Sequence, residues 1–340
     1  MTLTSGGLRR YVEDLSLALA TEFPEDFYTL ISDQAFALPQ GAAANLEAVI
    51  RGERRYWSFG LRRALPELGI ELFHGTNFEV PYLGRTPAVL TIHDLSPWKN
   101  SAWHVNADRV RQRTPWLIRL RRARLILTVS EAVAREVVTY FGVSPETVRA
   151  VPLAASGLFR PVTPTTPPPR PYFLFVGTLE PRKNLGMLIE AWQSVYRETG
   201  TELAIVGRTR PDFVPIAQQP GLIMMGEVSD AELPRLYANA TAFVYPTLYE
   251  GFGLPVLEAM QCGCPVITSR DPAVMEVSGG VALHANSSEE FASTMLALAQ
   301  NPDLRNRLRE AGTVRAGAFS WETTARRTHE VYEESVRLGD

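Results

Sequence analysis

Short apolar runs alternate with longer helical patterns along the 340-residue chain, and this alternation constrains the fold more than any other feature. The apolar runs are rich in valine, isoleucine, leucine and phenylalanine and cover residues 88–92, 125–129, 172–176, 203–206, 242–245 and 265–268. Strands that are apolar along their whole length are typical of parallel sheets, because helices cover both faces of such sheets. The alternation therefore predicts an α/β fold built on parallel sheets.

Serines mark the starts of several expected helices. Ser130 precedes one helical pattern, while Ser229 and Ser287 are each followed three residues later by a glutamate, which is the spacing of a capping box. Pro255 suits the first turn of a further helix, and Pro115 is expected to begin a short one.

A proline-rich segment divides the chain. Residues 161–171 contain six prolines and can form neither a helix nor a central strand. We therefore expect a Rossmann-like domain over residues 1–160, a linker over 161–171 and a second Rossmann-like domain over 172–318. The helical pattern over 319–340 is expected to pack back toward the first domain.

The first domain begins unusually. A Rossmann-like domain opens with an apolar strand of about five or six residues that leads into a glycine loop. Here only Met1 to Thr4 precede the loop Ser5-Gly6-Gly7. We expect either that the natural gene begins upstream or that the first sheet lacks its usual first strand.

Composition limits the class of partner. The net charge is −3, so a general nucleic-acid role has no support. No run approaches the roughly 18 to 20 apolar residues of a membrane span, and the start of the chain lacks the apolar core of a secretory signal. We therefore expect a cytoplasmic protein whose two cysteines, Cys262 and Cys264, are reduced.

Basic side chains and glycine amides stand where a diphosphate could bind. Arg182 and Lys183 follow the strand at 172–176 and together suit a diphosphate, although a solvated basic turn is the alternative. Gly6 and Gly7 begin a helix whose N–H groups could approach a phosphate, although a simple tight turn is the alternative.

His93 follows the strand at 88–92, and ligands bind at the carboxyl ends of parallel strands. An imidazole there could bind a sugar hydroxyl or stabilise charge. The alternative is a histidine that only caps the end of the strand.

The segment 243–258 is the most informative. Glu250 stands in a glycine-rich loop after a strand, and Glu258 lies about two helical turns later. Two carboxylates near a sugar can bind hydroxyl pairs and stabilise positive charge at the anomeric carbon. Four backbone N–H groups add a cradle for an anion: Gly251, Phe252, Gly253 and Leu254. A capped surface helix with two unrelated acids is the alternative, and it does not account for Gly-Phe-Gly.

Glu250 and Glu258, with Gly-Phe-Gly-Leu-Pro-Val-Leu between them, resemble the motif of family four of the retaining glycosyltransferases. The Glu-Pro-Arg-Lys-Asn segment at 180–184 resembles the donor-diphosphate motif of that family. The likeness covers nearly the whole chain, with further similar segments in the same order at 128–131, 203–207, 226–230 and 264–267. Gly279-Gly-Val281 departs from the Gly-Asp-Ala sequence that the family often has, so no site is expected there.

The resemblance implies a GT-B fold, in which two Rossmann-like domains face a central cleft that binds a nucleotide diphosphate sugar. It implies that Glu258 binds the ribose, that Glu250 holds the transferred sugar with the N–H groups at 251–254, and that Arg182 and Lys183 neutralise the leaving diphosphate. Five other residues are implied in donor binding: Gly6 and Gly7 near the diphosphate, His93 facing the sugar, Val228 beside the base, and Arg208 as a further positive charge. Such enzymes are usually metal-independent, so no metal or other cofactor is expected.

The expected reaction is transfer of a hexose, with retention of anomeric configuration, to a glycan or lipid-linked acceptor. We rank GDP-mannose first as donor and UDP-hexoses second. The alternatives are an epimerase or a phosphorylase of the same architecture, a catalytically weak nucleotide-sugar binder, and a nicotinamide dehydrogenase. The chain has only two lysines, Lys99 and Lys183, which disfavours a pyridoxal-dependent phosphorylase, and no Gly-x-Gly-x-x-Gly follows a strand.

A basic segment points to the acceptor side. Seven arginines and no acidic residue lie between Arg109 and Arg124, interleaved with Trp116, Leu117 and Leu120. Arginines beside tryptophan and leucine suit an anionic membrane surface or a lipid-linked diphosphate. The alternative is an ordinary helix with its arginines in water. Peripheral contact with the inner face of a membrane is therefore one expectation for this segment.

Overall fold

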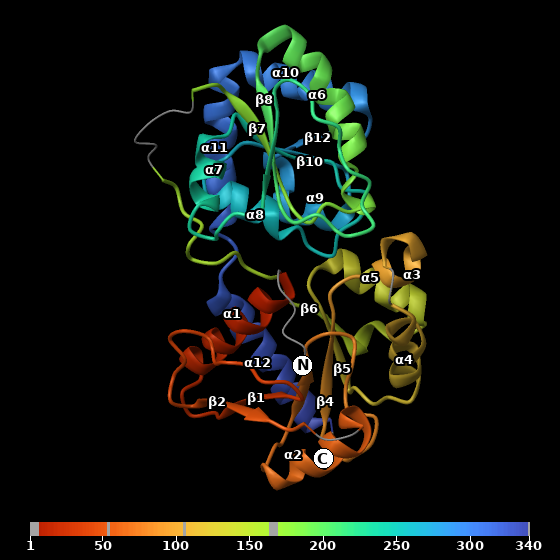
Figure 1. The fold of residues 1–340 in the computed structure, drawn as a ribbon. Helices are drawn as coiled ribbons and strands as arrows, with labels where there is room; N and C mark the ends of the chain where they lie inside the picture. The colour runs from red at the N-terminus through yellow and green to blue at the C-terminus, as the bar shows by residue number, and fades with distance from the viewer. Residues whose placement is uncertain (1–6, 53–54, 105–106, 163–168, 339–340) are drawn as a thin grey trace. The chain divides into compact units, whose positions relative to one another are not determined.

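The computed structural model describes residues 7–52, 55–104, 107–162 and 169–338, and the chain divides into two compact units (Figure 1). One unit comprises residues 1–154 and 320–340, and the other comprises residues 155–319. The first division lies six residues before the expected end of the first domain at 160. Residues 1–6, which include Gly6, and residues 163–168 of the expected linker lie outside the described residues.

The first unit contains two parallel sheets. The larger has the order β3 (Phe73–Gly75), β4 (Ala88–Ile92), β5 (Leu125–Thr128) and β6 (Val148–Ala150), and the smaller pairs β1 (Tyr28–Ser32) with β2 (Leu46–Ile50). Helix α1 (Gly7–Glu22) packs against α12 (Trp321–Arg337), which also contacts β4. The remaining α-helices of this unit are α2 (Leu61–Glu67), α3 (Ser96–Lys99), α4 (Asp108–Arg119) and α5 (Glu131–Phe141).

The second unit is a doubly wound sheet of six parallel strands. Its spatial order is β12 (Leu283–His284), β11 (Val266–Thr268), β10 (Ala242–Tyr245), β7 (Tyr172–Val176), β8 (Glu202–Val206) and β9 (Leu222–Gly226). The chain runs outward from β7 to β9 and then returns to β10 on the other side of β7. The strand order therefore reverses between β7 and β10, and such a switch point is where ligands bind in open parallel sheets.

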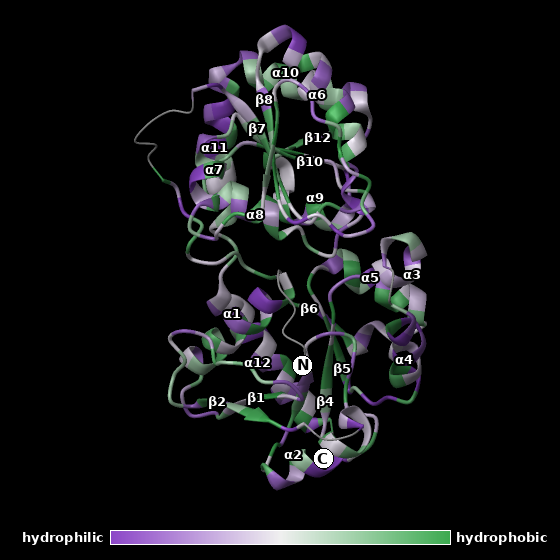
Figure 2. Ribbon diagram, in the orientation of Figure 1, coloured by the Kyte–Doolittle hydropathy of each residue, from purple (hydrophilic) through white to green (hydrophobic). Residues whose placement is uncertain are grey.

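Helices cover both faces of this sheet (Figure 1). Helix α6 (Leu185–Thr199) packs against α10 (Ser288–Gln300), while α8 (Leu254–Gln261) packs against α7 (Leu233–Asn239), α9 (Pro272–Ser278) and α11 (Pro302–Ala316). Every residue of β7 and β10 is buried, and Figure 2 colours these strands mostly as hydrophobic. Burial on both faces explains why these strands are apolar along their length, and the predicted α/β fold with parallel sheets is confirmed.

Two of the predicted helix caps form. In each, a serine side chain accepts a hydrogen bond from a free N–H of the first helical turn. Ser130 Oγ accepts from Val133 N at 3.1 Å, and Ser287 Oγ accepts from Glu290 N at 3.2 Å. At Ser229 only half of the predicted capping box forms: its N–H donates to the Glu232 carboxylate at 3.2 Å, but its Oγ also donates to Glu232 instead of capping the helix, and α7 begins only at Leu233.

The prediction that Pro115 begins a helix was wrong. Pro115 lies inside α4, which begins seven residues earlier at Asp108. A proline seven residues into a helix removes one N–H donor, yet the rest of the α4 segment keeps its helical form. None of the described helices is both long and apolar enough to cross a membrane.

Candidate active site

Two loops leave the sheet of the second unit at its switch point. After β7 the chain forms a single 3₁₀ turn at Pro181–Lys183, and after β10 it forms a loop that contains Thr247 and Glu250. Since β7 and β10 are adjacent parallel strands, both loops emerge at the same edge of the sheet. The fold therefore brings together side chains that lie about 65 residues apart in the sequence.

The Glu250 carboxylate is the centre of this arrangement. Its Oε1 accepts hydrogen bonds from Lys183 Nζ at 2.5 Å, Thr247 Oγ1 at 2.7 Å and the Tyr245 hydroxyl at 2.9 Å. Its Oε2 accepts from an Arg182 guanidinium nitrogen at 2.9 Å. We call these five side chains, Arg182, Lys183, Tyr245, Thr247 and Glu250, the Glu250 network.

Neighbouring charges determine the pKa values of Glu250 and Lys183 in this network. Burial alone would raise the pKa of Glu250, but the charges of Arg182 and Lys183 and the hydrogen bonds it accepts lower that pKa to about 2. Burial and the neighbouring charge of Arg182 lower the pKa of Lys183, whereas Glu250 acts in the opposite direction. Glu250 is therefore a carboxylate at neutral pH and cannot serve there as a proton donor.

A second carboxylate holds Arg182 from the other side. Glu180 Oε1 accepts from Arg182 Nε at 3.1 Å and from a terminal nitrogen at 2.8 Å, and its Oε2 lies 3.5 Å from Arg210. Arg182 also donates to the Tyr249 carbonyl at 2.6 Å. These contacts fix the guanidinium in one orientation at the edge of the sheet.

Asp271 connects the network to the next strand. Its Oδ2 accepts from the Glu250 backbone N–H at 3.3 Å, and its Oδ1 caps α9 by accepting from Ala273 N and Val274 N. Burial raises the pKa of Asp271 from 3.8 to about 6, although the hydrogen bond from Val274 N acts in the opposite direction. This carboxyl therefore titrates closer to neutral pH than Glu250 does.

Glu258 has a different environment from Glu250. It is buried in α8, and its Oε2 accepts from the Tyr237 hydroxyl at 3.1 Å. Gly253 adopts a left-handed φ of 100° just before α8, and its Cβ position would lie 3.2 Å from Val274. Gly251, Phe252 and Gly253 are buried, and Leu254 is the first residue of the helix.

Arg208 and Val228 of the second unit, also predicted to bind the donor, are not part of the Glu250 network. Arg208 is exposed and follows β8, while Val228 is partly buried in the loop between β9 and α7. Asn184 occupies the N-cap position of α6 with a φ of 54°, and its side chain makes no capping hydrogen bond there.

The first unit carries Gly7 and His93. Gly7 is exposed at the start of α1. His93 Nε2 lies 2.8 Å from the Thr76 carbonyl oxygen, and the ring meets Tyr11 edge-on at 4.8 Å between centroids. Burial lowers the pKa of His93, although the bond to Thr76 and the charge of Asp94 act in the opposite direction. The neutral ring must carry its proton on Nε2, because a carbonyl only accepts, and Nδ1 is then an acceptor.

Sequence reasoning missed several members of the site. Tyr245 and Thr247 were not assigned, although both stand at the carboxyl end of a predicted strand. Glu180 lay within the Glu-Pro-Arg-Lys-Asn segment without a role, and Asp271 follows the strand predicted at 265–268. A search for polar residues within a few positions of every strand end would have found them.

Metal ligands do not gather at this site. Across the described ranges, no group of three or more histidine, cysteine, aspartate or glutamate side chains could hold a metal ion. Cys262 and Cys264 are buried and unpaired.

Both units match known protein families. Residues 162–315 match the family described as "Glycosyl transferases group 1", and residues 5–155 match "Glycosyltransferase Family 4". An O-antigen chain mannosyltransferase B from Escherichia coli is 35% identical over 284 residues, which cover 77% of this chain and 74% of the relative. An MMP alpha-(1->4)-mannosyltransferase from Mycolicibacterium hassiacum is 32% identical over 225 residues, covering 62% of this chain and 54% of the relative.

Solved structures of low sequence identity share the fold. HepE from Anabaena, in complex with UDP-glucose, has a TM-score of 0.73 and 16% identity, with 98% of each chain covered. WaaG, a glycosyltransferase involved in lipopolysaccharide biosynthesis, has a TM-score of 0.72 and 16% identity, with 96% of each chain covered. Together with the family matches to both units and the 35% identical relative, this fold shows that the chain belongs to the group 1 glycosyltransferases.

Proposed function

We propose that this glycosyltransferase moves a hexose from a nucleotide diphosphate sugar to a glycan or lipid-linked acceptor with retention of anomeric configuration. The observation that carries the proposal is the Glu250 network, in which Arg182 and Lys183 are held side by side at the switch point of the second unit. Two fixed cations at the carboxyl ends of parallel strands suit a diphosphate leaving group.

The bond changes define what each group must do. The bond between the anomeric carbon and the diphosphate oxygen breaks, and its electron pair stays on the phosphate. The acceptor oxygen bonds to the same face of the anomeric carbon, and its proton passes to the departing phosphate. Arg182 and Lys183 stabilise the growing negative charge in place of a metal ion, so we expect transfer to survive treatment with EDTA.

Glu250 has two tasks in this proposal. Its ionised carboxylate holds the two cations in place, and it accepts hydrogen bonds from hydroxyls of the transferred sugar together with the N–H groups at 251–254. Glu258 binds the ribose hydroxyls, exchanging its contact with Tyr237 for them. From the other residues we expect contacts to the diphosphate by Gly6, Gly7 and Arg208, to the base by Val228, and to a sugar hydroxyl by the acceptor nitrogen of His93.

Mannose is the sugar we rank first, with GDP as the nucleotide. The two relatives described above, 35% and 32% identical, are named as mannosyltransferases. A panel of GDP-mannose, UDP-glucose and UDP-N-acetylglucosamine tested by thermal shift separates the donors. A ligand at about 100 times its dissociation constant adds roughly 2.7 kcal/mol to the free energy of unfolding. We expect stabilisation by GDP-mannose, and stabilisation by a UDP-sugar alone would reverse the ranking.

The alternative is a catalytically weak nucleotide-sugar binder of the same fold. Such a protein would be stabilised by a donor in the thermal-shift panel but would release no nucleoside diphosphate. The two proposals therefore predict the same binding of the donor but different release of nucleoside diphosphate.

For the acceptor side we propose peripheral contact with an anionic membrane surface, such as the inner face of a membrane, through the end of α4. Most of the basic segment is engaged within the first unit: Arg109 pairs with Glu79, and Arg122 donates to the carbonyls of Pro81 and Gly84. Four exposed residues form the remaining surface, which we call the α4 end patch: Trp116, Arg119, Leu120 and Arg121.

The α4 end patch combines apolar area with positive charge. Trp116 is 49% exposed and Leu120 is 50% exposed. We expect binding to vesicles that contain anionic lipid, weakened as salt shortens the screening length to about 3 Å at 1 M. Arg119→Gln with Arg121→Gln should abolish pelleting, while Arg62→Gln with Arg63→Gln on α2 should not. Pelleting that is unchanged in the first pair, or absent in the unaltered chain, would refute membrane contact by this patch.

A further inference from the structure

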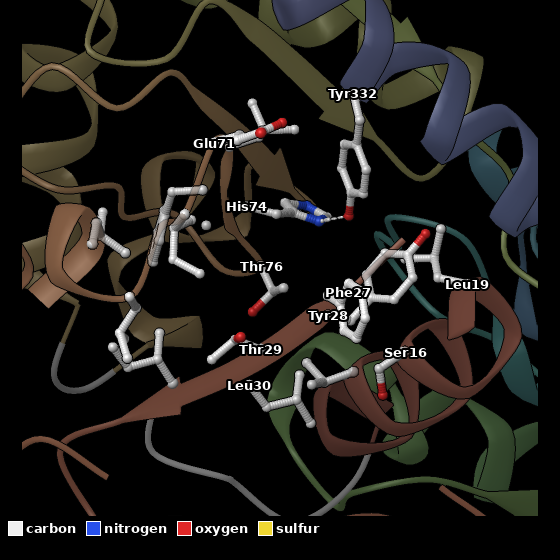
Figure 3. A pocket seen from close by; sticks show the side chains of 18 of the residues that line it. Ser16, Leu19, Phe27, Tyr28, Thr29, Leu30, Glu71, His74, Thr76 and Tyr332 are labelled. Atoms are coloured by element: carbon white, nitrogen blue, oxygen red, sulfur yellow. Dashed lines mark hydrogen bonds between the residues drawn. The ribbon is translucent and has the colours of Figure 1, made fainter. Parts of the chain in front are cut away.

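Four side chains of the first unit form a series of hydrogen bonds that the proposed chemistry does not use. His74 of β3 bonds through Nδ1 to the Tyr332 hydroxyl of α12 and through Nε2 to Thr91 Oγ1 of β4, at 2.6 Å each. Thr91 Oγ1 also lies 3.1 Å from the hydroxyl of Tyr11 in α1. Figure 3 shows the bond between His74 and Tyr332, beside a cavity that both residues line. We call Tyr11, His74, Thr91 and Tyr332 the Tyr11 cluster.

The Tyr11 cluster carries no charge near neutral pH. Burial lowers the pKa of His74 to about 3, and the charge of His93 acts in the same direction. Burial also raises the pKa of Tyr11 and of Tyr332. A neutral imidazole has one N–H donor and one acceptor nitrogen, so His74 donates to one hydroxyl and accepts from the other. The cluster therefore keeps one protonation state near neutral pH, which suits a structural tie rather than an acid or a base.

Tyr11 is the member of the cluster that contacts His93. The two rings meet edge-on, with their centroids 4.8 Å apart and their planes at 86°. Tyr11 is only 4% exposed, and its ring also lies 6.5 Å from that of Trp321, the first residue of α12. Aromatic pairs at such distances favour particular relative orientations. The buried tyrosine ring therefore restricts the imidazole of His93 on one side.

The loop after β3 restricts His93 at a second point. His93 Nε2 donates to the Thr76 carbonyl at 2.8 Å. Gly75 lets this loop fold closely on itself, because a Cβ on Gly75 would lie 1.9 Å from the Glu79 carbonyl oxygen. With Nε2 as the donor, Nδ1 of His93 is the acceptor. The ring contact with Tyr11 and the bond to Thr76 together fix the direction of that acceptor.

The hydroxyl of Tyr11 has a separate effect on α1. Tyr11 lies about one helical turn after Gly7, where α1 begins. Its bond to Thr91 ties that turn to the carboxyl end of β4, two residues before His93. One side chain thus holds both the first turn of α1 and the imidazole, which are two of the features that the proposed function assigns to the donor.

We infer that Tyr11 is a positioning residue for transfer, whose ring orients the imidazole of His93 and whose hydroxyl fixes the first turn of α1 through Thr91. The role rests on the proposed function, in which His93 binds the transferred sugar and Gly7 approaches the diphosphate. His74 and Tyr332 hold the Thr91 hydroxyl from the other side. Misplacing such a group by about 1 Å can lower a rate on the order of 10²-fold, so the tie matters for turnover.

Two substitutions separate the ring from the hydroxyl, with the donor that stabilises the chain in the thermal-shift panel. Tyr11→Leu removes the ring and should lower kcat by about tenfold or more, because His93 is no longer oriented. Tyr11→Phe keeps the ring but breaks the bond to Thr91, so it should raise the donor KM by about threefold and leave kcat nearly unchanged. The control is Tyr56→Leu, at a tyrosine of the first unit that is 6% exposed. It should lower the melting temperature and leave kcat unchanged.

His93→Ala tests whether Tyr11 acts through His93. If it does, adding Tyr11→Leu to His93→Ala should lower kcat by less than about twofold further, whereas independent effects would multiply. Multiplied losses would overturn the inference for the ring, and an unchanged donor KM in Tyr11→Phe would overturn it for the hydroxyl.

The imidazole nitrogen resonances of His93, recorded without donor, give a readout that does not depend on turnover. We expect the Nε2–H tautomer in the unaltered chain, in Tyr11→Phe and in Tyr56→Leu, and a mixture of tautomers in Tyr11→Leu. An unchanged Nε2–H tautomer in Tyr11→Leu would overturn the inference that the ring orients His93. Absence of transfer by the unaltered chain would instead refute the proposed function, and the tautomer would still decide whether Tyr11 orients His93.

Discussion

Lys183 and Glu250 form a buried ion pair whose members depend on each other. Their side chains are 8% and 10% exposed, and their charged atoms lie 2.5 Å apart. Removing one partner of such a pair leaves the other charge buried without compensation. A lysine in a solvated basic turn, the alternative considered above, could be removed with little effect on stability, whereas a lysine buried against Glu250 cannot.

Lys183→Met should therefore lower the free energy of unfolding by about 3–5 kcal/mol and reduce transfer by about tenfold or more. Adding Glu250→Gln to Lys183→Met should restore part of the stability, because the carboxylate that lost its lysine partner is gone while Arg182 keeps its contacts with Glu180 and the Tyr249 carbonyl, but should not restore transfer. Urea unfolding and a nucleoside diphosphate assay measure the two effects. A double variant that is as unstable as the single one would show that the pair is not coupled.

The pH dependence of stability should report on Glu250. Folding lowers the pKa of Glu250 from 4.5 to about 2, so its stabilising contribution is complete above pH 4.5 and is lost as the pH falls toward 2. Glu250→Gln should flatten the stability profile in that window. The pH dependence due to Asp271 has the opposite sign. Folding raises its pKa, so its contribution to the free energy of unfolding falls as the pH rises from 3.8 to about 6. Asp271→Asn should remove that fall. Unfolding by urea at several pH values measures both slopes, and unchanged slopes in both variants would contradict the assigned ionisation.

The charged residues of the Glu250 network could be predicted from the sequence, but the residues that hydrogen-bond to them could not. Arg182, Lys183 and Glu250 stand in motifs with characteristic spacing, and the structure brings all three together. Tyr245 could not be assigned as a partner of Lys183, nor Asp271 as a partner of Glu250, because these contacts depend on which strands are neighbours, and that order is a property of the whole sheet.

At the scale of elements, apolar runs located strands well because burial on both faces leaves a strong pattern. The predicted strands at 88–92, 172–176 and 242–245 coincide with β4, β7 and β10. Local capping signals were less dependable. Ser229 has the spacing of a capping box, yet its side chain donates to Glu232 within a turn that precedes α7.

Two glycines control how closely the loops after β7 and β8 approach. Gly207 has a φ of 140°, and a Cβ on it would lie 1.9 Å from the carbonyl oxygen of Gly177. Gly207→Ala should lower the free energy of unfolding by at least about 2 kcal/mol, since both the backbone conformation and the contact are strained. Gly186→Ala in α6 is the control: no atom lies within 4 Å of its Cβ position, and a helical alanine should be neutral or stabilising. Equal stability of the two variants in urea would contradict this account of the loops.

At the scale of the whole molecule, the alternation of strands and helices predicted the α/β class but not the order of the strands. The switch point between β7 and β10 arises because the chain returns to the other side of β7 after β9. No local pattern encodes that return, since it depends on the relative stability of alternative sheets. The structure places the division after Ala154, six residues before the expected boundary at residue 160, and the proline-rich segment falls within the second unit.

The central claim is that Arg182 and Lys183 receive the diphosphate of a nucleotide sugar during transfer. The most direct measurement is release of nucleoside diphosphate from GDP-mannose and from UDP-hexoses, in the presence of a lipid-linked glycan acceptor mixture, by the unaltered chain and by Arg182→Ala. We predict release of GDP from GDP-mannose, and a rate lower by about tenfold or more in Arg182→Ala, because a hydrogen bond to a charged group contributes about 1.5–3 kcal/mol. Release that is equally fast in Arg182→Ala, or no release from any donor, would contradict the account.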